Sequence, residues 1–417
     1  MMLPIPVLLV SYFFPPTNTA GVYRIMGFTK YLGSSGIRPI LLTALPVPSR
    51  ERVDPALATK VSGDLIICRT RTWCFPKTTK NGIWGKILNV AADQFDRFLP
   101  VDPYLLFGIA ASRSARHLIL RYRCKAVVTS SPPHSIHLIG FVQKRYFGMP
   151  WIADFRDLVI AKPRSFSDRL ERLVVENADV TIANTPTNRS ILASRYPSCK
   201  DRIIVIPNGF DPDDRDLLPI LKKQGDNPAR KLLIVYTGEI YPGMGEALWG
   251  GLRILKEMDP SISERLEIRI AGILSESDLR QIENQGLSDI VKYVGFLPVA
   301  ECSALLAKSD VALFLLPQSG VSHWVPSKLY NYLGARKFVV AIVPVGDASR
   351  IIEEVNAGIC VRPIPQKIAE AFMELVELKD RGDIESAYNI DALQKYSRIF
   401  QVKQLAEAIR NISSKDK

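Results

Sequence analysis

Short apolar runs of strand length alternate with longer amphipathic stretches along the first half of the chain. The apolar runs predict strands at residues 7–11, 39–43, 126–130, 151–154, 180–183 and 203–206. The stretches with apolar positions at helical spacing predict helices at residues 21–34, 136–147 and 168–177. Because a strand that follows a crossover helix runs parallel to the strand before it, this half should form a parallel sheet covered on both faces.

The same alternation begins again after residues 212–230, a polar, proline-containing segment that we interpret as a linker. It predicts further strands at residues 232–236, 266–271, 290–294, 311–316, 339–343 and 358–361. Helices are expected at residues 245–258 and, as one amphipathic element near the end of the chain, 391–411. The predicted fold class is therefore α/β, with two doubly wound, Rossmann-like parallel sheets. Ligands of such sheets bind at the carboxyl ends of the strands, so we expect the site in a cleft between the domains.

Composition places the chain among soluble or peripheral globular proteins. Its 417 residues are 47% hydrophobic and 23% charged, which is enough apolar material for two cores. The six cysteines include no CxxC pair, which disfavours a disulfide scaffold or a structural zinc site and fits a reducing cytoplasm. Prolines interrupt the apolar run near the N-terminus and no basic residue precedes it, so we predict neither a signal peptide nor a spanning helix.

Basic charge is concentrated in the first half of the chain. Residues 1–210 hold 28 Lys and Arg against 13 Asp and Glu, a net charge of +15, whereas residues 211–417 hold 26 against 29, a net charge of −3. This asymmetry indicates an anionic partner, either nucleic acid, a membrane surface or a phosphorylated substrate; a solvated basic surface is the alternative. No nucleic-acid recognition module can be identified in the sequence, so we expect no nucleic-acid partner.

Residues 69–100 interleave basic and aromatic side chains. Basic groups attract anionic lipid and aromatic rings can enter the interface, so this segment predicts peripheral attachment to an anionic membrane. The alternative is a helical excursion that packs on its own domain. Attachment would place a cytoplasmic protein at the inner face of the membrane.

Candidate chemistry in the first half follows the predicted strands. The turn from Ser11 to Gly21 leads into a helix whose N-terminal N–H groups can hold an anion, and Arg24 lies one turn further on; an ordinary structural loop is the alternative. His134 and His137 follow the strand at 126–130, where a histidine can bind sugar hydroxyls or transfer a proton. Structural and metal-binding roles are the alternatives, but no Asp, Glu or Cys lies beside this pair to complete a metal site.

Three further segments at strand ends carry polar or glycine residues. The segment Asp154-Phe-Arg156-Asp157 offers either a substrate contact or a structural ion pair. The glycine loop at 238–245 lacks the third glycine of a dinucleotide fingerprint but can face a phosphate. Lys328 falls in the first turn of a predicted helix, where its charge opposes the helix dipole unless a phosphate lies between them.

Taken together, these segments resemble the GT-B glycosyltransferases, and within them glycosyltransferase family 4 and its bacterial polysaccharide-assembly relatives. The likeness covers about 85% of the chain and rests on VLLVSYFFPPTNTAGVYR (7–24), SSPPHSIHLIG (130–140), PWIADFRD (150–157), VIPNGFD (205–211), IVYTGEIYPG (234–243), YVGFLP (293–298) and VPSKLYNYLGARKFVVA (325–341). It implies retaining sugar transfer from a nucleotide sugar, UDP- or GDP-linked, to an anionic or lipid-linked glycan acceptor, without metal or another cofactor. Residues 1–211 would bind the acceptor and residues 231–390 the donor, with residues 391–417 crossing back to the first domain.

The resemblance also assigns residues. It implies catalytic roles for His134 and Asp157, acceptor binding by His137 and Arg156, and donor binding by Gly21, Arg24, Gly238, Phe296, His323, Lys328 and Asn331. The family has paired glutamates eight positions apart, and here these positions hold His323 and Asn331. These departures leave open a catalytically weakened sugar-nucleotide-binding protein. Nucleotide-sugar epimerases share the predicted architecture and are a further alternative.

Overall fold

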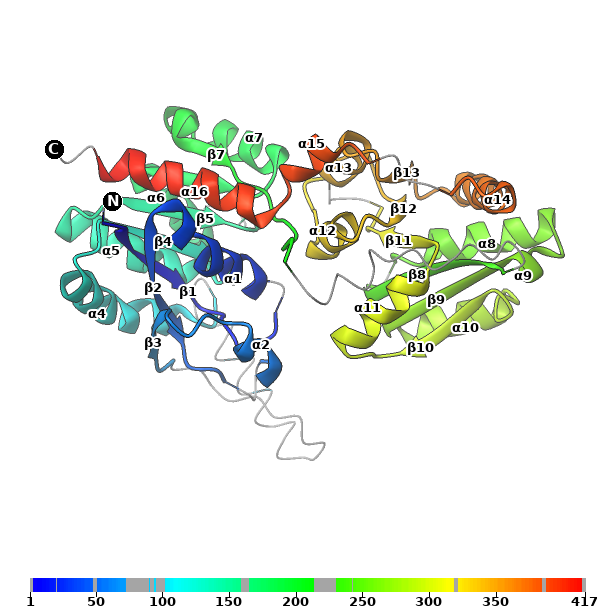
Figure 1. The fold of residues 1–417 in the computed structure, drawn as a ribbon, viewed down its shortest axis with the longest axis horizontal. Helices are drawn as coiled ribbons and strands as arrows, with labels where there is room; N and C mark the ends of the chain where they lie inside the picture. The colour runs from blue at the N-terminus through cyan, green and yellow to red at the C-terminus, as the bar shows by residue number, and fades with distance from the viewer. Residues whose placement is uncertain are drawn as a thin grey trace. The chain divides into compact units, whose positions relative to one another are not determined.

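Two compact α/β units make up the chain in the computed structural model (Figure 1). The structure describes residues 3–19, 21–47, 51–72, 90, 94, 102–158, 165–213, 230–241, 243–318, 322–384 and 388–414. Met1–Asn208 and Arg398–Lys417 form the first unit, and Gly209–Ser397 form the second. Both units contain a parallel sheet between two layers of helices, which confirms the predicted fold class. Most of the predicted linker at 212–230 lies outside the described residues.

The first unit contains a seven-stranded parallel sheet, as far as the described residues show, in the order β3-β2-β1-β4-β5-β6-β7. Its strands are β1 (Ile5–Ser11), β2 (Ile37–Ala44), β3 (Ile66–Thr70), β4 (Ala126–Ser131), β5 (Trp151–Phe155), β6 (Val180–Ala183) and β7 (Ile203–Val205). Alternate residues of β1 face opposite cores, since Val7 and Leu9 belong to one cluster and Leu8 and Val10 to the other. This two-sided burial explains the continuous apolar run in the sequence.

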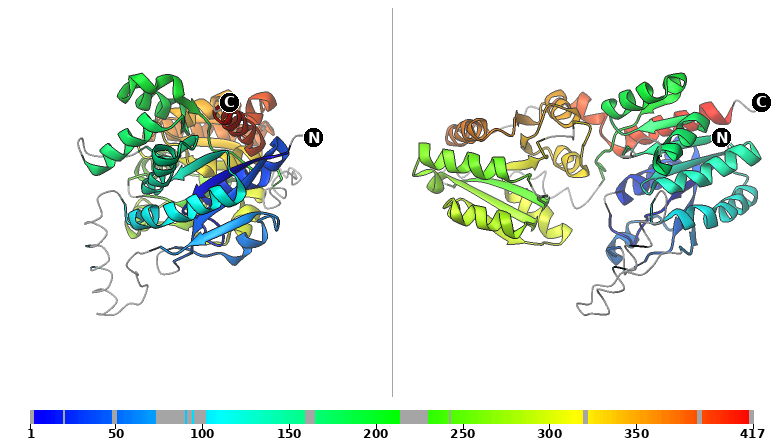
Figure 2. Two further views of the ribbon diagram at one scale, coloured as in Figure 1. Left: turned by 90° about the vertical axis from the view of Figure 1, so that its left-hand side faces the viewer. Right: turned by 180° about the vertical axis from the view of Figure 1, so that it is seen from behind.

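Two helical layers cover this sheet (Figures 1 and 2). One face is covered by α4 (Leu105–Tyr122), α5 (His137–Phe147), α6 (Phe166–Asn177) and α7 (Pro186–Arg195). The other face is covered by α1 (Val22–Tyr31) and α16 (Arg398–Ser413). A short helix, α2 (Pro55–Thr59), precedes β3. None of the described helices is both long and apolar enough to cross a bilayer.

The second unit contains a six-stranded parallel sheet, again counted over the described residues, in the order β10-β9-β8-β11-β12-β13. Its strands are β8 (Leu232–Glu239), β9 (Leu266–Ile273), β10 (Val291–Gly295), β11 (Val311–Leu315), β12 (Phe338–Ile342) and β13 (Gly358–Val361). One face packs against α8 (Glu246–Met258), α9 (Ile262–Arg265), α10 (Glu276–Asn284) and α14 (Pro365–Arg381). The other packs against α11 (Val299–Lys308), α12 (Ser327–Gly334), α13 (Asp347–Glu354) and α15 (Ile390–Gln394).

The helix predicted at 391–411 is two helices, α15 and α16. The backbone N–H of Phe210 donates to the carbonyl of Tyr396 (3.0 Å), and Phe210 forms a parallel bridge with Ser397. These contacts hold residues 396–397 beside the segment at Phe210, so the helix cannot continue through them. The prediction of one continuous helix was wrong because both pieces carry apolar stripes, which periodicity cannot separate.

Candidate functional site

Several of the sequence-predicted residues lie at the topological switch point of a sheet. In the first unit β1 and β4 are neighbours, although β2 and β3 lie between them in the sequence, and the loops that follow them carry Gly21 and His134. In the second unit β8 and β11 are neighbours in the same way; Gly238 lies at the carboxyl end of β8, and Lys328 lies in α12, which follows β11. In doubly wound sheets the carboxyl ends of these strands are where ligands bind. Each unit therefore carries one candidate half-site.

Gly21 and Arg156 form the centre of the first half-site. Gly21 is the N-cap of α1, and a Cβ at this position would lie 1.6 Å from Nη1 of Arg156. Arg156 is buried and donates from Nε to the Ser131 carbonyl (2.5 Å) and from Nη2 to the Pro132 carbonyl (2.9 Å). Burial lowers the pKa of Arg156 to about 10, so the guanidinium stays charged at neutral pH. A cation against a helix N-terminus opposes the dipole, an arrangement that an anion would relieve.

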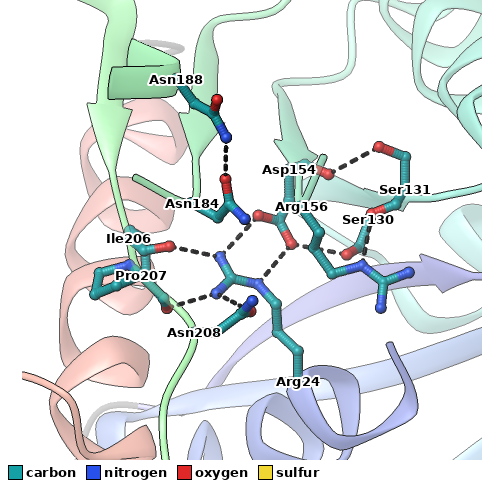
Figure 3. A network of polar contacts seen from close by, with 10 residues as sticks. All are labelled: Arg24, Ser130, Ser131, Asp154, Arg156, Asn184, Asn188, Ile206, Pro207 and Asn208. Atoms are coloured by element: carbon teal, nitrogen blue, oxygen red, sulfur yellow. Dashed lines mark hydrogen bonds and ion pairs between the residues drawn. The ribbon is translucent and has the colours of Figure 1, made fainter. Parts of the chain in front are cut away.

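Arg24, predicted to bind the donor, instead belongs to a buried structural network (Figure 3). Its guanidinium donates to both carboxylate oxygens of Asp154 (2.9 and 2.8 Å) and to the carbonyls of Ile206 (3.0 Å) and Pro207 (2.7 Å). A fifth bond goes to Oδ1 of Asn208 (3.4 Å). A guanidinium has five N–H donors, so this network leaves none of them for a phosphate. The structure thus corrects the sequence prediction for Arg24.

Asp154 and Arg156 are not the ion pair that their spacing suggested. Asp154 pairs with Arg24 and accepts a hydrogen bond from Ser130 Oγ (2.7 Å), whereas Arg156 donates to backbone carbonyls (Figure 3). The third charged residue of the segment, Asp157, follows the end of β5 and is exposed. An exposed carboxylate at this edge is accessible to a substrate hydroxyl, and Asp157 keeps its place among the candidates.

His134 lies in a short 3-10 turn (His134–Ile136) between β4 and α5. Burial, and next the positive charge of Arg156, lower the pKa of His134 to about 4, so its ring is neutral at pH 7. Its Nδ1 is buried and makes no hydrogen bond to any described residue. A neutral imidazole at a sheet edge can donate a hydrogen bond to a sugar hydroxyl or accept one from it.

His137, predicted to bind the acceptor, is completely buried in α5 (0% exposed). Its Nδ1 lies 2.8 Å from Thr129 Oγ1, and its ring packs 4.5 Å from the Phe155 ring, centre to centre. Burial holds its pKa well below the usual range. With no exposed surface, His137 cannot touch an acceptor in this structure, and the prediction of direct contact is corrected.

Asp102 is a residue of this half-site that the sequence analysis missed. Its carboxylate accepts from the backbone N–H of Ser135 (2.8 Å), from Ser135 Oγ (2.7 Å) and from the backbone N–H of Tyr104 (3.0 Å). It therefore fastens the start of α4 to the turn that carries His134. Asp102 lies just before α4, where an aspartate is a common local cap. A partner 33 residues away leaves no signal in the sequence.

Lys328 and Tyr236 form the centre of the second half-site. Lys328 Nζ donates to Tyr236 Oη (2.7 Å), and that hydroxyl donates to the Glu239 carbonyl (2.7 Å). Gly238 (φ +120°) lies beside them, since a Cβ there would come within 2.9 Å of Lys328 Nζ. Burial lowers the pKa of Lys328 to about 8, and the charge of Glu239 acts in the opposite direction. The lysine thus sits in the first turn of α12, largely buried, and keeps its charge at neutral pH.

The other predicted donor residues are scattered around this lysine. Asn331 is exposed on α12, one turn beyond Lys328, and the half-buried His323 lies in the segment before α12 with its ring edge-on to Trp324. Phe296 is 68% exposed after β10. Their contact with a donor stays a prediction. Within the described residues, no three His, Cys, Asp or Glu side chains are placed to hold a metal ion.

Comparison with known proteins identifies the family. Residues 76–214 match the sequence pattern described as Glycosyltransferase Family 4. The chain is 33% identical over 374 residues to the probable glycosyltransferase WbjE of Pseudomonas aeruginosa, covering 82% of this chain and 84% of that protein. The chain belongs to glycosyltransferase family 4. This membership makes the protein a glycosyltransferase and sets aside the epimerase alternative.

Solved structures of glycosyltransferases share the fold of this family 4 enzyme. A glycosyltransferase from Rickettsia africae superimposes with a TM-score of 0.69 at 15% identity, covering 99% of each chain. HepE from Anabaena, solved in complex with UDP and glucose, superimposes with a TM-score of 0.61 at 17% identity, covering 97% of this chain and 99% of that one. At these identities the likeness supports the GT-B fold of the glycosyltransferase.

Proposed function

We propose that this glycosyltransferase moves a sugar, with retention of its anomeric configuration, from a nucleoside-diphosphate sugar to an anionic or lipid-linked glycan acceptor in polysaccharide assembly. The second unit binds the donor and the first unit binds the acceptor. UDP-linked sugars are the first donors to test, because HepE, which shares the fold, was solved with UDP; GDP-linked sugars come second.

The observation that carries the donor assignment is Lys328 in the first turn of α12. A lysine at this place opposes the helix dipole, and burial adds a desolvation cost. A diphosphate bound at the N-terminus of α12 would offset both costs. Gly238 leaves the approach to Lys328 Nζ open, because any side chain there would collide with it. Breaking the sugar–phosphate bond puts charge on the leaving diphosphate, which fixed N–H groups and a lysine stabilise.

His134 and Asp157 are the candidates for contact with the reacting sugar and the acceptor. The neutral imidazole of His134 would hydrogen-bond a hydroxyl of the transferred sugar, and the exposed carboxylate of Asp157 would accept a hydrogen bond from the acceptor hydroxyl. The positive Arg156 at the N-terminus of α1 would favour an anionic group on either substrate.

Calorimetry with UDP and with uridine tests the donor site. Lys328→Met should weaken UDP binding about tenfold or more, the usual value of a charge-assisted bond, and leave uridine binding unchanged. Lys337→Met is the matched control, because burial also lowers the pKa of Lys337 to about 8, but its Nζ bonds the carbonyls of Ala307 (3.0 Å) and Ser309 (2.7 Å). UDP affinity that is equal in wild type and Lys328→Met would reject this site. Anomer analysis of the product tests retention.

Peripheral membrane attachment is the second part of the proposal. The segment first predicted to mediate it, residues 69–100, lies mostly outside the described residues. A different surface now supports the proposal, on α4 and α5, two adjacent helices that carry no Asp or Glu. Exposed apolar and basic side chains alternate on it, namely Ile109, Arg113, Leu120, Arg145, Tyr146 and Phe147, together with the half-buried Arg116. Such a surface suits the headgroup region of an anionic bilayer.

A further inference from the structure

Two histidine nitrogens next to the proposed sugar site are buried without a partner among the described residues. They are Nδ1 of His134 and Nε2 of His137. Both rings pack on Phe155, with centre-to-centre distances of 6.0 Å for His134 and 4.5 Å for His137. Buried polar atoms are rarely left unpaired, because each one costs the desolvation of that group. Both atoms would have a hydrogen-bond partner if the Nε2–H of His137 donated to Nδ1 of His134 through a shared water.

The proton on His137 can be placed from its other neighbours. Trp151 Nε1 is a donor only, and it donates to Thr129 Oγ1 (2.8 Å). The hydroxyl hydrogen of Thr129, a fully buried residue, needs an acceptor, and His137 Nδ1 lies 2.8 Å from Oγ1. His137 is neutral at physiological pH, because burial lowers its pKa far below 6.5. With Nδ1 as acceptor, the single proton of the neutral ring is on Nε2.

The side chains around His134 and His137 are tightly packed. Gly140, one turn after His137 in α5, leaves room for the indole, since a Cβ there would lie 2.0 Å from Trp151 Nε1. Asp102 holds the turn of His134 through Ser135, the residue between the two histidines. Both rings are therefore fixed in place by contacts to neighbouring elements.

We propose that His137 is a positioning residue that sets the tautomer of His134: its Nε2–H donates to Nδ1 of His134 through one shared water. His134 then carries its own proton on Nε2 and presents an N–H donor to the substrate. The relay runs from Trp151 through Thr129 and His137 to His134. The inference rests on the proposed role of His134 at the sugar site, and it gives that histidine a defined role as donor.

Nuclear magnetic resonance tests the relay without any assay of activity. The chain has four histidines, so selective labelling with 15N-histidine gives a small set of ring signals. Long-range 1H–15N correlation should show Nδ1 unprotonated and Nε2 protonated on both His134 and His137. His137→Phe keeps an aromatic ring but removes the donor, and should leave His134 as a mixture of tautomers. His137→Gln can still accept from Thr129 and donate onward, so it should preserve the His134 tautomer.

Thr129 provides a second pair of variants. Thr129→Val removes the hydroxyl and should shift His137 away from its Nε2–H tautomer, whereas Thr129→Ser keeps the hydroxyl and should not. A protonated Nδ1 on His137 in the wild-type protein would overturn the relay. An unchanged His134 tautomer in His137→Phe would do the same.

Steady-state kinetics then separate a positioning role from a merely structural one. His137→Phe should lower kcat about tenfold, less than the roughly 10²–10⁴-fold contribution of a catalytic acid or base, because His137 acts only through His134, with donor KM unchanged. In the His134→Ala background the same substitution should have no further effect on kcat. An equal loss in both backgrounds means that His137 does not act through His134 and rejects the inference. If His134→Ala transfers sugar at the wild-type rate while the tautomers are as assigned, the relay stands and the catalytic assignment of His134 fails.

Discussion

The guanidinium of Arg156 fills the space that a side chain on Gly21 would occupy. The ideal Cβ of Gly21 would lie 1.6 Å from Nη1 and 2.3 Å from Cζ of Arg156. Gly21 has an ordinary helical φ of −73°, so glycine is required here for space and not for backbone conformation. Two residues that lie 135 positions apart in the chain thus share one small volume at the N-terminus of α1.

Gly21→Ala should therefore displace Arg156. We expect a loss of about 1–3 kcal/mol in the free energy of unfolding, the usual cost of overpacking, together with a large fall in transferase activity. Gly33→Ala is the control, because nothing lies within 4 Å of a Cβ at Gly33 in the same unit. Denaturant unfolding and initial rates measure both effects.

The cause of that loss can be isolated with a second substitution. Arg156→Ala should recover most of the stability lost in Gly21→Ala, because it removes the atoms that collide. If the two substitutions are simply additive in stability, the collision with Arg156 is not the reason for glycine at position 21.

Breaking the Arg24–Asp154 ion pair should lower the free energy of unfolding substantially. Both side chains are buried, at 3% and 0% exposed. Asp154→Asn leaves the Arg24 charge in the core without its partner, so we expect a loss of about 3–5 kcal/mol in unfolding free energy. Glu257→Gln, the same chemical change in the exposed pair with Arg253, should cost no more than about 0.5 kcal/mol. Similar midpoints of urea unfolding for the two variants would contradict the structural role of the network.

Binding of UDP should weaken as pH rises through about 8. Lys328 binds the diphosphate in its protonated form, and burial lowers its pKa in the free protein to about 8. Above that pH the free protein must take up a proton to bind, so affinity should fall by up to about tenfold per pH unit until the pKa of the complex is reached. Calorimetry between pH 7 and 9.5 measures this slope. Lys328→Met should show a flat profile, and a flat profile in the wild type would exclude Lys328 as the titrating group.

Asn331 and His323 should affect different parts of the donor. Asn331 is expected to accept a hydrogen bond from the ribose where the family has a carboxylate, so Asn331→Ala should weaken uridine and UDP by similar factors. His323→Ala should weaken only the complete nucleotide sugar. Binding of the three ligands to each variant measures this division. If His323→Ala weakened the binding of uridine and of the nucleotide sugar by the same factor, His323 would not contact the sugar of the donor.

Sequence patterns predicted most of the fold because the buried parallel strands are apolar on both faces. All strands were predicted to within a few residues except β3. Its residues Ile66–Thr70 are half-buried at the edge of the sheet and end in Arg69 and Thr70, so the apolar run that marks them is only four residues long, from Leu65 to Cys68. The boundary between α15 and α16 was missed for the opposite reason, since apolar stripes continue on both sides of a break that only Phe210 and Ser397 define.

The candidate site was predictable in location but not in the roles of its side chains. The rule that ligands bind at strand ends pointed to the carboxyl ends of β1, β4, β8 and β11, which are the switch-point strands of the two sheets. This rule does not show that all five N–H donors of Arg24 bond Asp154 and three neighbouring residues (Figure 3). Nor does it show that His137 is buried in the core. The partners of Arg24 lie 130 or more residues away in the sequence, and His137 packs on the neighbouring strands β4 and β5, so no local pattern contains these contacts.

The α4–α5 surface should bind anionic membranes in a salt-sensitive manner. On α4 the residues Ile109, Arg113, Arg116 and Leu120 recur at helical spacing, and Arg116 stacks over the Phe147 ring at the end of α5 (4.0 Å). Arginines supply attraction to anionic headgroups, and the exposed Ile109 and Leu120 (60% and 61%) supply apolar area for the interface.

Flotation with vesicles of anionic and of neutral lipid measures this binding. Arg113→Glu combined with Arg116→Glu should reduce flotation with anionic vesicles several-fold, since each basic residue near such a surface contributes about 1 kcal/mol. Ile109→Ser should weaken binding at high salt, where charge attraction is screened and apolar insertion remains. Arg253→Glu, on the second unit and half exposed, should have no effect. Equal flotation with neutral and anionic vesicles would rule out this surface as an anionic-membrane site, and so would unchanged flotation of the double variant. Retention on nucleic acid at physiological salt would instead assign this surface to nucleic acid.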